Sequence, residues 1–121
     1  MRFRTIPPHD WYSFLGDFSR RHAGSLVTMN VKGAAVTPTD EVIDQPLRGI
    51  SDDRGAIVIH IGDGEHHPHL GHRLDHVDTV VLEQTEEGAD SAVEIRSADG
   101  DVTLVRFRSP IITEMLDPAV E

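Results

Sequence analysis

Six of the eight histidines in this chain lie between positions 60 and 76. They are His60, His66, His67, His69, His72 and His76. Neutral imidazole is a common ligand of zinc, copper and nickel, and histidine changes its charge close to physiological pH. The cluster could therefore be a metal site, a pH-sensitive surface or a histidine-rich turn without a chemical role.

Four of these residues are the candidate ligands for zinc or nickel: His60, His67, His69 and His72. In His67-Pro68-His69 two histidines flank one residue, a spacing found in cupins and several metallohydrolases. The cupin motif also needs a glutamate four or five residues later, where this chain has Arg73 and Leu74. Catalytic zinc sites have three protein ligands and structural sites have four. The metal hypothesis thus depends on how many of these rings the fold brings together.

The secondary structure of residues 68–77 decides which rings can meet. A helix would place His69, His72 and His76 along one face, although Gly71 would cost that helix about 1 kcal/mol. A strand would instead form a hairpin with residues 56–61. We favour the strand because consecutive elements usually pair.

In the strand model, His60 lies near Gly71, and His69 lies diagonal to His60. One loop histidine, His66 or His67, could join these two rings. His72 would point to the opposite face of the strand, together with the isoleucines of residues 56–61. At most three of the rings could then meet.

The elements that position this cluster begin with an amphipathic helix over about residues 8–23. Its apolar stripe has the spacing of one helix face and consists of Trp11, Phe14, Leu15, Phe18 and His22. Pro8 and Asp10 suit the first helical turn, and Gly24 suits a left-handed stop. We expect the stripe to pack as core.

After Gly24 the apolar residues alternate with a period of two, which is typical of strands. Strands are predicted at residues 25–32, 47–51, 56–61, 79–85, 91–97 and 102–108. Residues 33–46 have the weakest pattern, which indicates a long loop that could enclose a short edge strand at residues 41–43. Pro110 is expected to end the last strand, leaving residues 110–121 as a short tail.

The last two strands are predicted to form a hairpin around Ala98-Asp99-Gly100, with Gly100 left-handed. This three-residue loop buries more apolar area than a two-residue loop would. Its register pairs Val93 with Val105, Ile95 with Thr103, and Ser91 with Phe107.

Together these elements predict a single α+β domain over residues 1–121, with a β region over about residues 25–109. Six or seven mostly antiparallel strands would form a strongly bent sheet or a partly open small barrel. The N-terminal helix would lie against one opening or one face.

The charge balance excludes several classes of partner. The net charge is −10, from 21 acidic and 11 basic residues, which opposes non-specific binding to nucleic acid and to anionic lipid. No apolar stretch approaches the length of a membrane span, and the first residues lack the apolar run of a signal peptide. The absence of cysteine excludes disulfides and thiol catalysis. We therefore expect a cytoplasmic protein that binds neither nucleic acid nor membranes.

Other catalytic motifs are missing from the sequence. Gly62-Asp63-Gly64 lacks the spacing of a dinucleotide or Walker loop, and the chain has no Gly-x-Ser-x-Gly elbow. Because no catalytic set is assembled, we expect a protein that is not an enzyme.

Segments from the helix to the last strand share the pattern of a known family. They include Trp11 with Phe14-Leu15 and Phe18-Ser19-Arg20-Arg21-His22, then Leu47-Arg48-Gly49-Ile50-Ser51, Val81-Leu82-Glu83-Gln84-Thr85, Gly88-Ala89-Asp90 and Ala98-Asp99-Gly100. The pattern resembles that of a family of small, functionally uncharacterised bacterial proteins with a single domain. The resemblance implies no catalytic motif, cofactor or substrate. In that pattern His72 is a more regular feature than His66, His67 and His69, which weakens the metal hypothesis.

The sequence thus predicts a non-enzymatic binding, interaction or regulatory module whose partner is an unidentified protein or small molecule. An exposed sheet edge would allow it to form a homo-oligomer. The alternative is a transition-metal protein that holds zinc or nickel with the four histidines named above.

Overall fold

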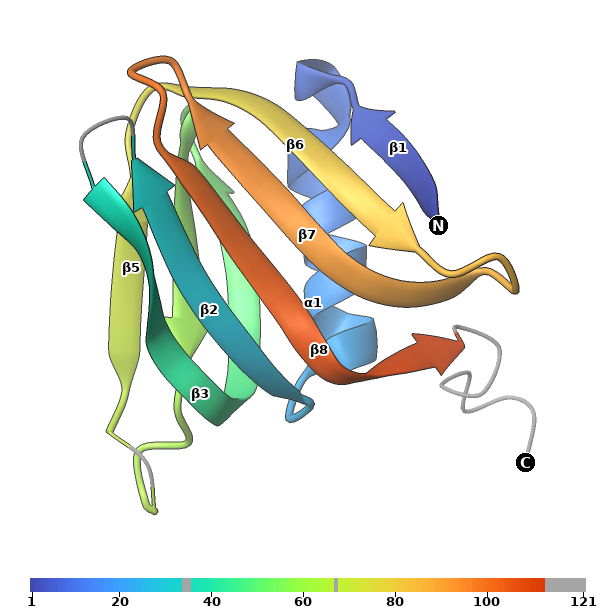
Figure 1. Cartoon of the computed structure of the whole chain (residues 1–121), viewed down its shortest axis with the longest axis vertical. Coiled ribbons are helices and arrows are strands. Elements are labelled where there is room, and N and C mark those ends of the chain that lie inside the picture. The colour runs from blue at the N-terminus through green and yellow to red at the C-terminus, as the bar shows by residue number, and fades with distance from the viewer. Residues whose placement is uncertain (34–35, 67, 113–121) are drawn as a thin grey trace.

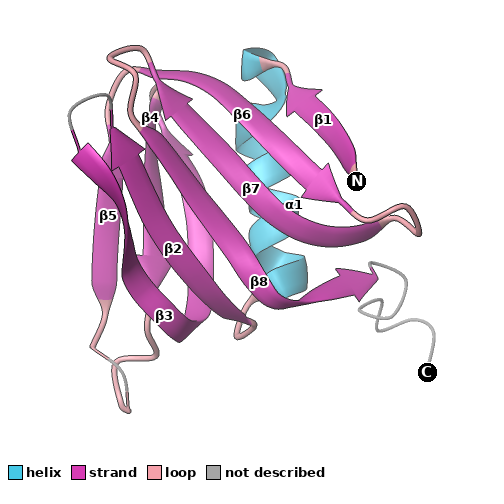
Figure 2. Ribbon diagram, viewed as in Figure 1, coloured by secondary structure: helices cyan, strands magenta, loops and turns pink. Residues whose placement is uncertain are grey.

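The computed structural model describes residues 1–33, 36–66 and 68–112. These residues form one α-helix and one antiparallel sheet of eight strands (Figures 1 and 2). The helix α1 spans Trp11–His22 and follows a short 3-10 helix at Pro8–Asp10. The strands are β1 (Arg2–Ile6), β2 (Leu26–Gly33), β3 (Val36–Asp53), β4 (Ala56–Ile61), β5 (Leu70–Leu74), β6 (Val77–Gln84), β7 (Ala89–Ser97) and β8 (Val102–Ile112). The α+β class is confirmed, whereas the prediction of six or seven strands is too low.

The strands follow one another across the sheet in the order β1-β6-β7-β8-β2-β3-β4-β5. Since β1 and β5 lie at opposite ends of this order, the described sheet is open and is not a closed barrel. Figure 1 shows the sheet curling where β3 turns away from β2, with α1 on the inner side of the curl. The buried core fills the space between this helix and the inner face of the sheet.

Strand β3 is 18 residues long and joins the two halves of the sheet. Its first part pairs with β2 and its last part pairs with β4. Register shifts interrupt the pairing with β2, and Asp44 has a left-handed φ of 51°. Such irregularities break the two-residue alternation by which a strand is recognised in a sequence. The predicted long loop over residues 33–46, with its short edge strand at 41–43, is therefore wrong.

Two further elements differ from the sequence prediction. Strand β1 was not expected, because only Ile6 of its five residues is buried and no apolar alternation marks it. It is held by backbone pairing to β6 at the edge of the sheet. Strand β8 continues to Ile112, so Pro110 does not end it. Of the predicted tail, residues 113–121 lie outside the described residues.

Helix α1 packs through the stripe that its sequence predicts. Leu15, Phe18 and His22 are fully buried, and the Phe18 ring lies 5.7 Å from that of Phe107 on β8. At the other end of the helix, Trp11 Nε1 donates a hydrogen bond to the backbone oxygen of Ile6. The helix is thereby fixed against β1 and β8, which are far apart in the sequence.

The predicted hairpin register is confirmed along most of its length. Val93 pairs with Val105, and Ile95 pairs with Thr103. The expected pairing of Ser91 with Phe107 is wrong, because the register shifts between Asp90 and Ala92. In the part of the chain that the structure describes, no helix is long and apolar enough to cross a membrane.

We expect Phe18→Ala to lower the free energy of unfolding by about 3–5 kcal/mol, because it opens a cavity where three elements meet. Urea denaturation followed by Trp11 fluorescence measures this change. The matched control is Tyr12→Ala on the same helix, whose side chain is 78% exposed and whose loss should cost less than about 0.5 kcal/mol. Equal losses in the two variants would show that the stripe is not the anchor of the helix.

Candidate functional site

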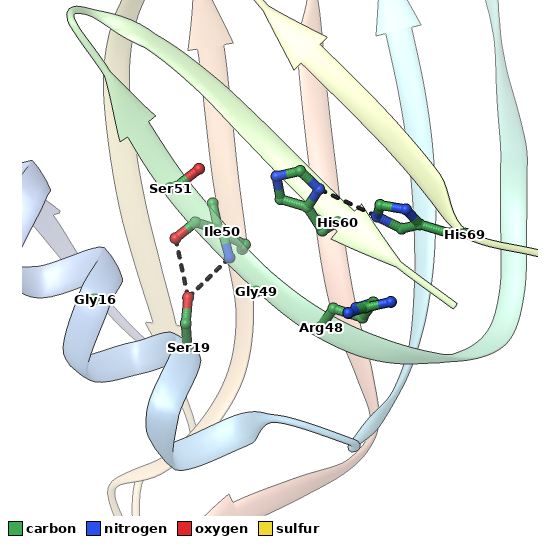
Figure 3. A pocket seen from close by; sticks show the side chains of 8 residues that line it. All are labelled: Gly16, Ser19, Arg48, Gly49, Ile50, Ser51, His60 and His69. Carbon is green, nitrogen blue, oxygen red and sulfur yellow. Dashed lines mark hydrogen bonds between the residues drawn. The ribbon is translucent and has the colours of Figure 1, made fainter. Parts of the chain in front are cut away.

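The hairpin of β4 and β5 brings two of the predicted ligands together. His60 pairs with Gly71 across the two strands, which is the register predicted from the sequence. His60 Nδ1 lies 3.3 Å from His69 Nε2, and the two rings are stacked with their centroids 5.4 Å apart (Figure 3). The strand interpretation of this segment is therefore confirmed for Leu70–Leu74, and the helix alternative is wrong.

The other predicted ligands do not join this pair. His72 pairs with the buried Ile59 and so points to the opposite face of β5. His66 is exposed on the loop before β5, with its Nδ1 3.6 Å from an oxygen of Asp63. His67 lies outside the described residues. Within residues 1–33, 36–66 and 68–112, no group of three or more histidines and carboxylates could hold a metal ion.

His60 and His69 line one end of a groove of about 390 Å³ between α1 and β3. Its remaining lining residues are Gly16, Ser19, Arg48, Gly49, Ile50 and Ser51. Ser19 fixes the floor, because its Oγ donates to the Ile50 carbonyl at 2.9 Å and accepts from the Ile50 N–H at 2.8 Å (Figure 3). Gly49 lies against this side chain, since a Cβ there would be 3.4 Å from the Cβ and Oγ of Ser19.

A β-bulge places Arg48 at the groove. Leu47 pairs with Ile61 and Gly49 pairs with His60, so Arg48 is the additional residue on β3. Bulges redirect side chains relative to a regular strand, and here Arg48 lies on the same side of the sheet as the two imidazole rings (Figure 3). Sequence analysis did not single out Arg48, since a bulge has no alternation signal of its own.

The titratable side chains that line the groove are basic, although the chain as a whole is acidic. Among the described residues, its charged and titratable lining is Arg48, His60 and His69, and no carboxylate lines it. Partial burial, and then the positive charges of His69 and Arg48, hold the pKa of His60 below its ordinary value. An anion bound between these groups would reverse the electrostatic part of that effect.

A second ionisable cluster lies buried at the C-terminal end of α1. His22 Nε2 lies 2.7 Å from Asp90 Oδ2, and both side chains are almost completely buried. Gln84 Nε2 donates to the other Asp90 oxygen at 2.9 Å, and Arg21 lies 3.8 Å away at the surface. Because an ionised carboxylate only accepts hydrogen bonds, His22 must carry its proton on Nε2 in this pair.

The balance of forces on Asp90 favours its ionised form. Burial alone would raise the pKa of Asp90, but the hydrogen bonds from His22 and Gln84 and the nearby charge of Arg21 lower it overall. The His22 ring also packs 4.6 Å from the rings of both Phe18 and Phe107. The two side chains have almost no exposed surface, and their hydrogen bond joins α1 to β7.

A comparison with models of known protein families relates this chain to one of them. Residues 2–115 match the model of a family of unknown function (DUF5335). The chain belongs to this family. The match includes the helix, both groove histidines and the buried pair, so these are parts of one family domain rather than additions to it. No curated protein and no solved structure matches the chain.

We expect Asp90→Asn to destabilise this family domain by about 1–3 kcal/mol at neutral pH, because the buried charge-assisted hydrogen bonds are lost. The pKa of Asp90 is lowered in the folded state, so its stabilisation is present above about pH 4 and is lost as the pH falls through the folded value. The gap between the wild-type protein and the variant should therefore narrow in acid.

Urea unfolding at neutral and acidic pH measures both effects. Asp78→Asn, at an exposed position on β6, is the control and should follow the wild type at every pH. A gap that widens in acid would contradict the assignment of a lowered pKa to Asp90.

Proposed function

We propose that this domain is a non-enzymatic binding module whose groove between α1 and β3 holds an anionic group of its partner molecule. The observation that carries the proposal is the wholly basic set of titratable side chains in the groove, Arg48, His60 and His69. Because the net charge of the chain is −10, a groove whose titratable side chains are all basic is not expected from a random distribution of charged residues over the surface.

The geometry of the three basic groups suits a carboxylate or phosphate oxygen. The guanidinium of Arg48 offers a planar fork of donors, which matches both of these anions. His60 Nδ1 and His69 Nε2 are hydrogen bonded to each other at 3.3 Å. Protonation of both rings would break this bond, and each ring could then donate to an oxygen of the anion. Gly71 leaves this space open, since a Cβ there would lie 3.9 Å from His60 Nδ1.

The hydrogen bonds of the groove support binding rather than catalysis. Both bonding functions of the Ser19 hydroxyl are used by the backbone of Ile50. A serine nucleophile instead donates its proton to a neighbouring base. Ser19 is therefore better suited to holding the helix against β3.

Titration with succinate, followed by NMR of the histidine rings, tests the proposal. We expect His60 and His69 to shift together and the affinity to rise between about pH 8 and about pH 6, because the bound anion favours the protonated imidazoles. Arg48→Met should weaken binding by about tenfold or more, since a charge-assisted bidentate contact is lost.

The control for this titration is Arg108→Met, at an exposed position on β8 outside the groove, which should leave the affinity unchanged. Inorganic phosphate in place of succinate distinguishes a preference for phosphate from one for carboxylate. Absence of any shift at either ring with both anions would refute the proposal.

A second candidate function, binding of zinc or nickel, is favoured by one distance. Two nitrogens bound tetrahedrally to zinc at about 2.0–2.1 Å lie about 3.3–3.4 Å apart. The His60 and His69 nitrogens lie 3.3 Å apart. The same distance is that of the hydrogen bond between them, so a metal ion, with water completing its shell, would replace this bond to take the two residues as ligands.

Metal analysis of untagged protein, purified without a nickel column, tests this second candidate. Stoichiometric zinc or nickel that is lost in His69→Ala and kept in His72→Ala would support a site made by the stacked pair. The two variants are matched, because His72 lies on the same hairpin but on its opposite face. Succinate binding that persists in a chelator, with no metal recovered, would leave the anion proposal and eliminate the metal site.

A further inference from the structure

The basic groove continues into a second hollow along the same seam between α1 and β3. This second hollow also measures about 390 Å³ and shares Gly16 and Ser51 with the first. Its other lining residues are Tyr12, Ser13, Asp17, Arg20 and Asp52. A Cβ on Gly16 would meet nothing nearer than the end of the Arg20 side chain at 3.6 Å. The two hollows thus adjoin at small residues, and together they are called the channel.

The two ends of this channel differ in character. The first end holds Arg48, His60 and His69, and the second end holds Asp52 and the Asp17–Arg20 ion pair. Tyr12 lies beside the second end, and its side chain is 78% exposed. Large aromatic side chains are frequent anchors of binding surfaces. A small anion would fill only the first end, so the full channel suits a longer ligand with its negative charge at one end.

Among the described residues, the edge of β3 along this seam has no neighbouring strand at one residue, Asp52. Pairing between β2 and β3 ends at Pro46, and the same edge is then covered at Leu47 by backbone bonds with Gly24 and Ser25. At Ile50 the Ser19 hydroxyl takes the place of a strand, bonding both its N–H and its carbonyl. Backbone groups in a strand face alternate edges, so Asp52 presents its N–H and carbonyl to this edge as well.

At Asp52 the described residues supply no strand for that edge, because β4 pairs with the opposite one. An exposed strand edge is a template for an added extended chain, and peptide-binding domains use it in this way. The second hollow lies beside Asp52, which leaves room for such a chain next to the helix.

We infer that this channel binds an extended peptide segment of a partner protein, with an acidic side chain at the basic end and its backbone bonded to β3 at Asp52. The inference rests on the proposed function for its charged end. It adds the class of the ligand, a peptide, and the way in which the ligand lies along the channel. Apolar side chains of the peptide would lie over Gly16 and against Tyr12.

The test uses NMR of the full chain with two pools of acetylated, amidated hexapeptides. Both pools vary leucine, serine and tyrosine at random positions, and they differ only in one fixed residue, glutamate or glutamine. The glutamate pool should shift the rings of His60 and His69 and the amides of Gly16, Ser51 and Asp52. The glutamine pool should bind about tenfold or more weakly, and succinate should shift only the residues of the basic end.

Two substitutions of Gly16 test whether the ligand needs an open junction between the two hollows, and neither changes the charges of the channel. Gly16→Leu places a side chain over the junction of the two hollows, whereas Gly16→Ala adds one methyl group at 3.6 Å from the end of the Arg20 side chain, and both should favour the helix. We expect Gly16→Leu to weaken the glutamate pool by about tenfold and to change succinate affinity by less than about threefold. Gly16→Ala should weaken the glutamate pool less than Gly16→Leu does, and Arg108→Met, outside both hollows, should leave both affinities nearly unchanged.

The outcomes separate this inference from the proposed function. Succinate shifts at His60 and His69 without any peptide shift at Asp52 would overturn the peptide inference and leave the anion-binding module intact. Equal binding of the two pools would show that the acidic side chain is not recognised. No response to succinate or to either pool would overturn both proposals.

Discussion

Strand β3 belongs to both halves of the sheet, and the rest of the fold follows from that constraint. It pairs with β2 up to Pro46 and with β4 from Leu47, so the chain must change partners within one continuous strand. Where β2 ends, the outer edge of β3 has backbone groups that need hydrogen bonds, since buried unpaired groups cost about 1–3 kcal/mol each. Helix α1 covers this edge and Ser19 satisfies Ile50. The groove lies where α1 leaves part of this β3 edge uncovered.

The position of α1 also depends on a buried charge at its other contact. Asp90 could not be buried alone, because an isolated carboxylate in an apolar interior is strongly disfavoured. Its hydrogen bonds with His22 and Gln84 offset that cost, and the bond with His22 exists only when the end of the helix lies against β7. A shift of the helix would leave the buried carboxylate with the Gln84 hydrogen bond and without its bond to His22, which costs more than a lost surface contact. The pair therefore favours one placement of α1, and thereby one width of the groove.

Local features of this fold could be predicted from the sequence, and features set by distant segments could not. The register of Val93 with Val105 follows from a short loop, and the approach of His60 to Gly71 follows from a neighbouring hairpin. The pairing of β1 with β6 joins segments about 80 residues apart and has no apolar alternation to reveal it. His22 and Asp90 are separated by 68 positions, and each looks like an ordinary polar residue in its own segment. Arg48 depends on a bulge, so the most basic part of the groove was the part least visible in the sequence.

The acidic surface and the basic groove act on a ligand over different distances. Charges farther away than about 8–10 Å are largely screened at physiological ionic strength, whereas two opposite charges 4 Å apart near a protein surface attract by about 4 kcal/mol. The net charge of −10 therefore repels anions weakly during their approach and does not cancel the contact with Arg48 once they arrive. Association is slowed for every anion, but only a ligand that reaches the three basic groups gains the short-range attraction. For the proposed anion site this combination favours selectivity over speed, because the net charge of −10 opposes the approach of a polyanion such as nucleic acid.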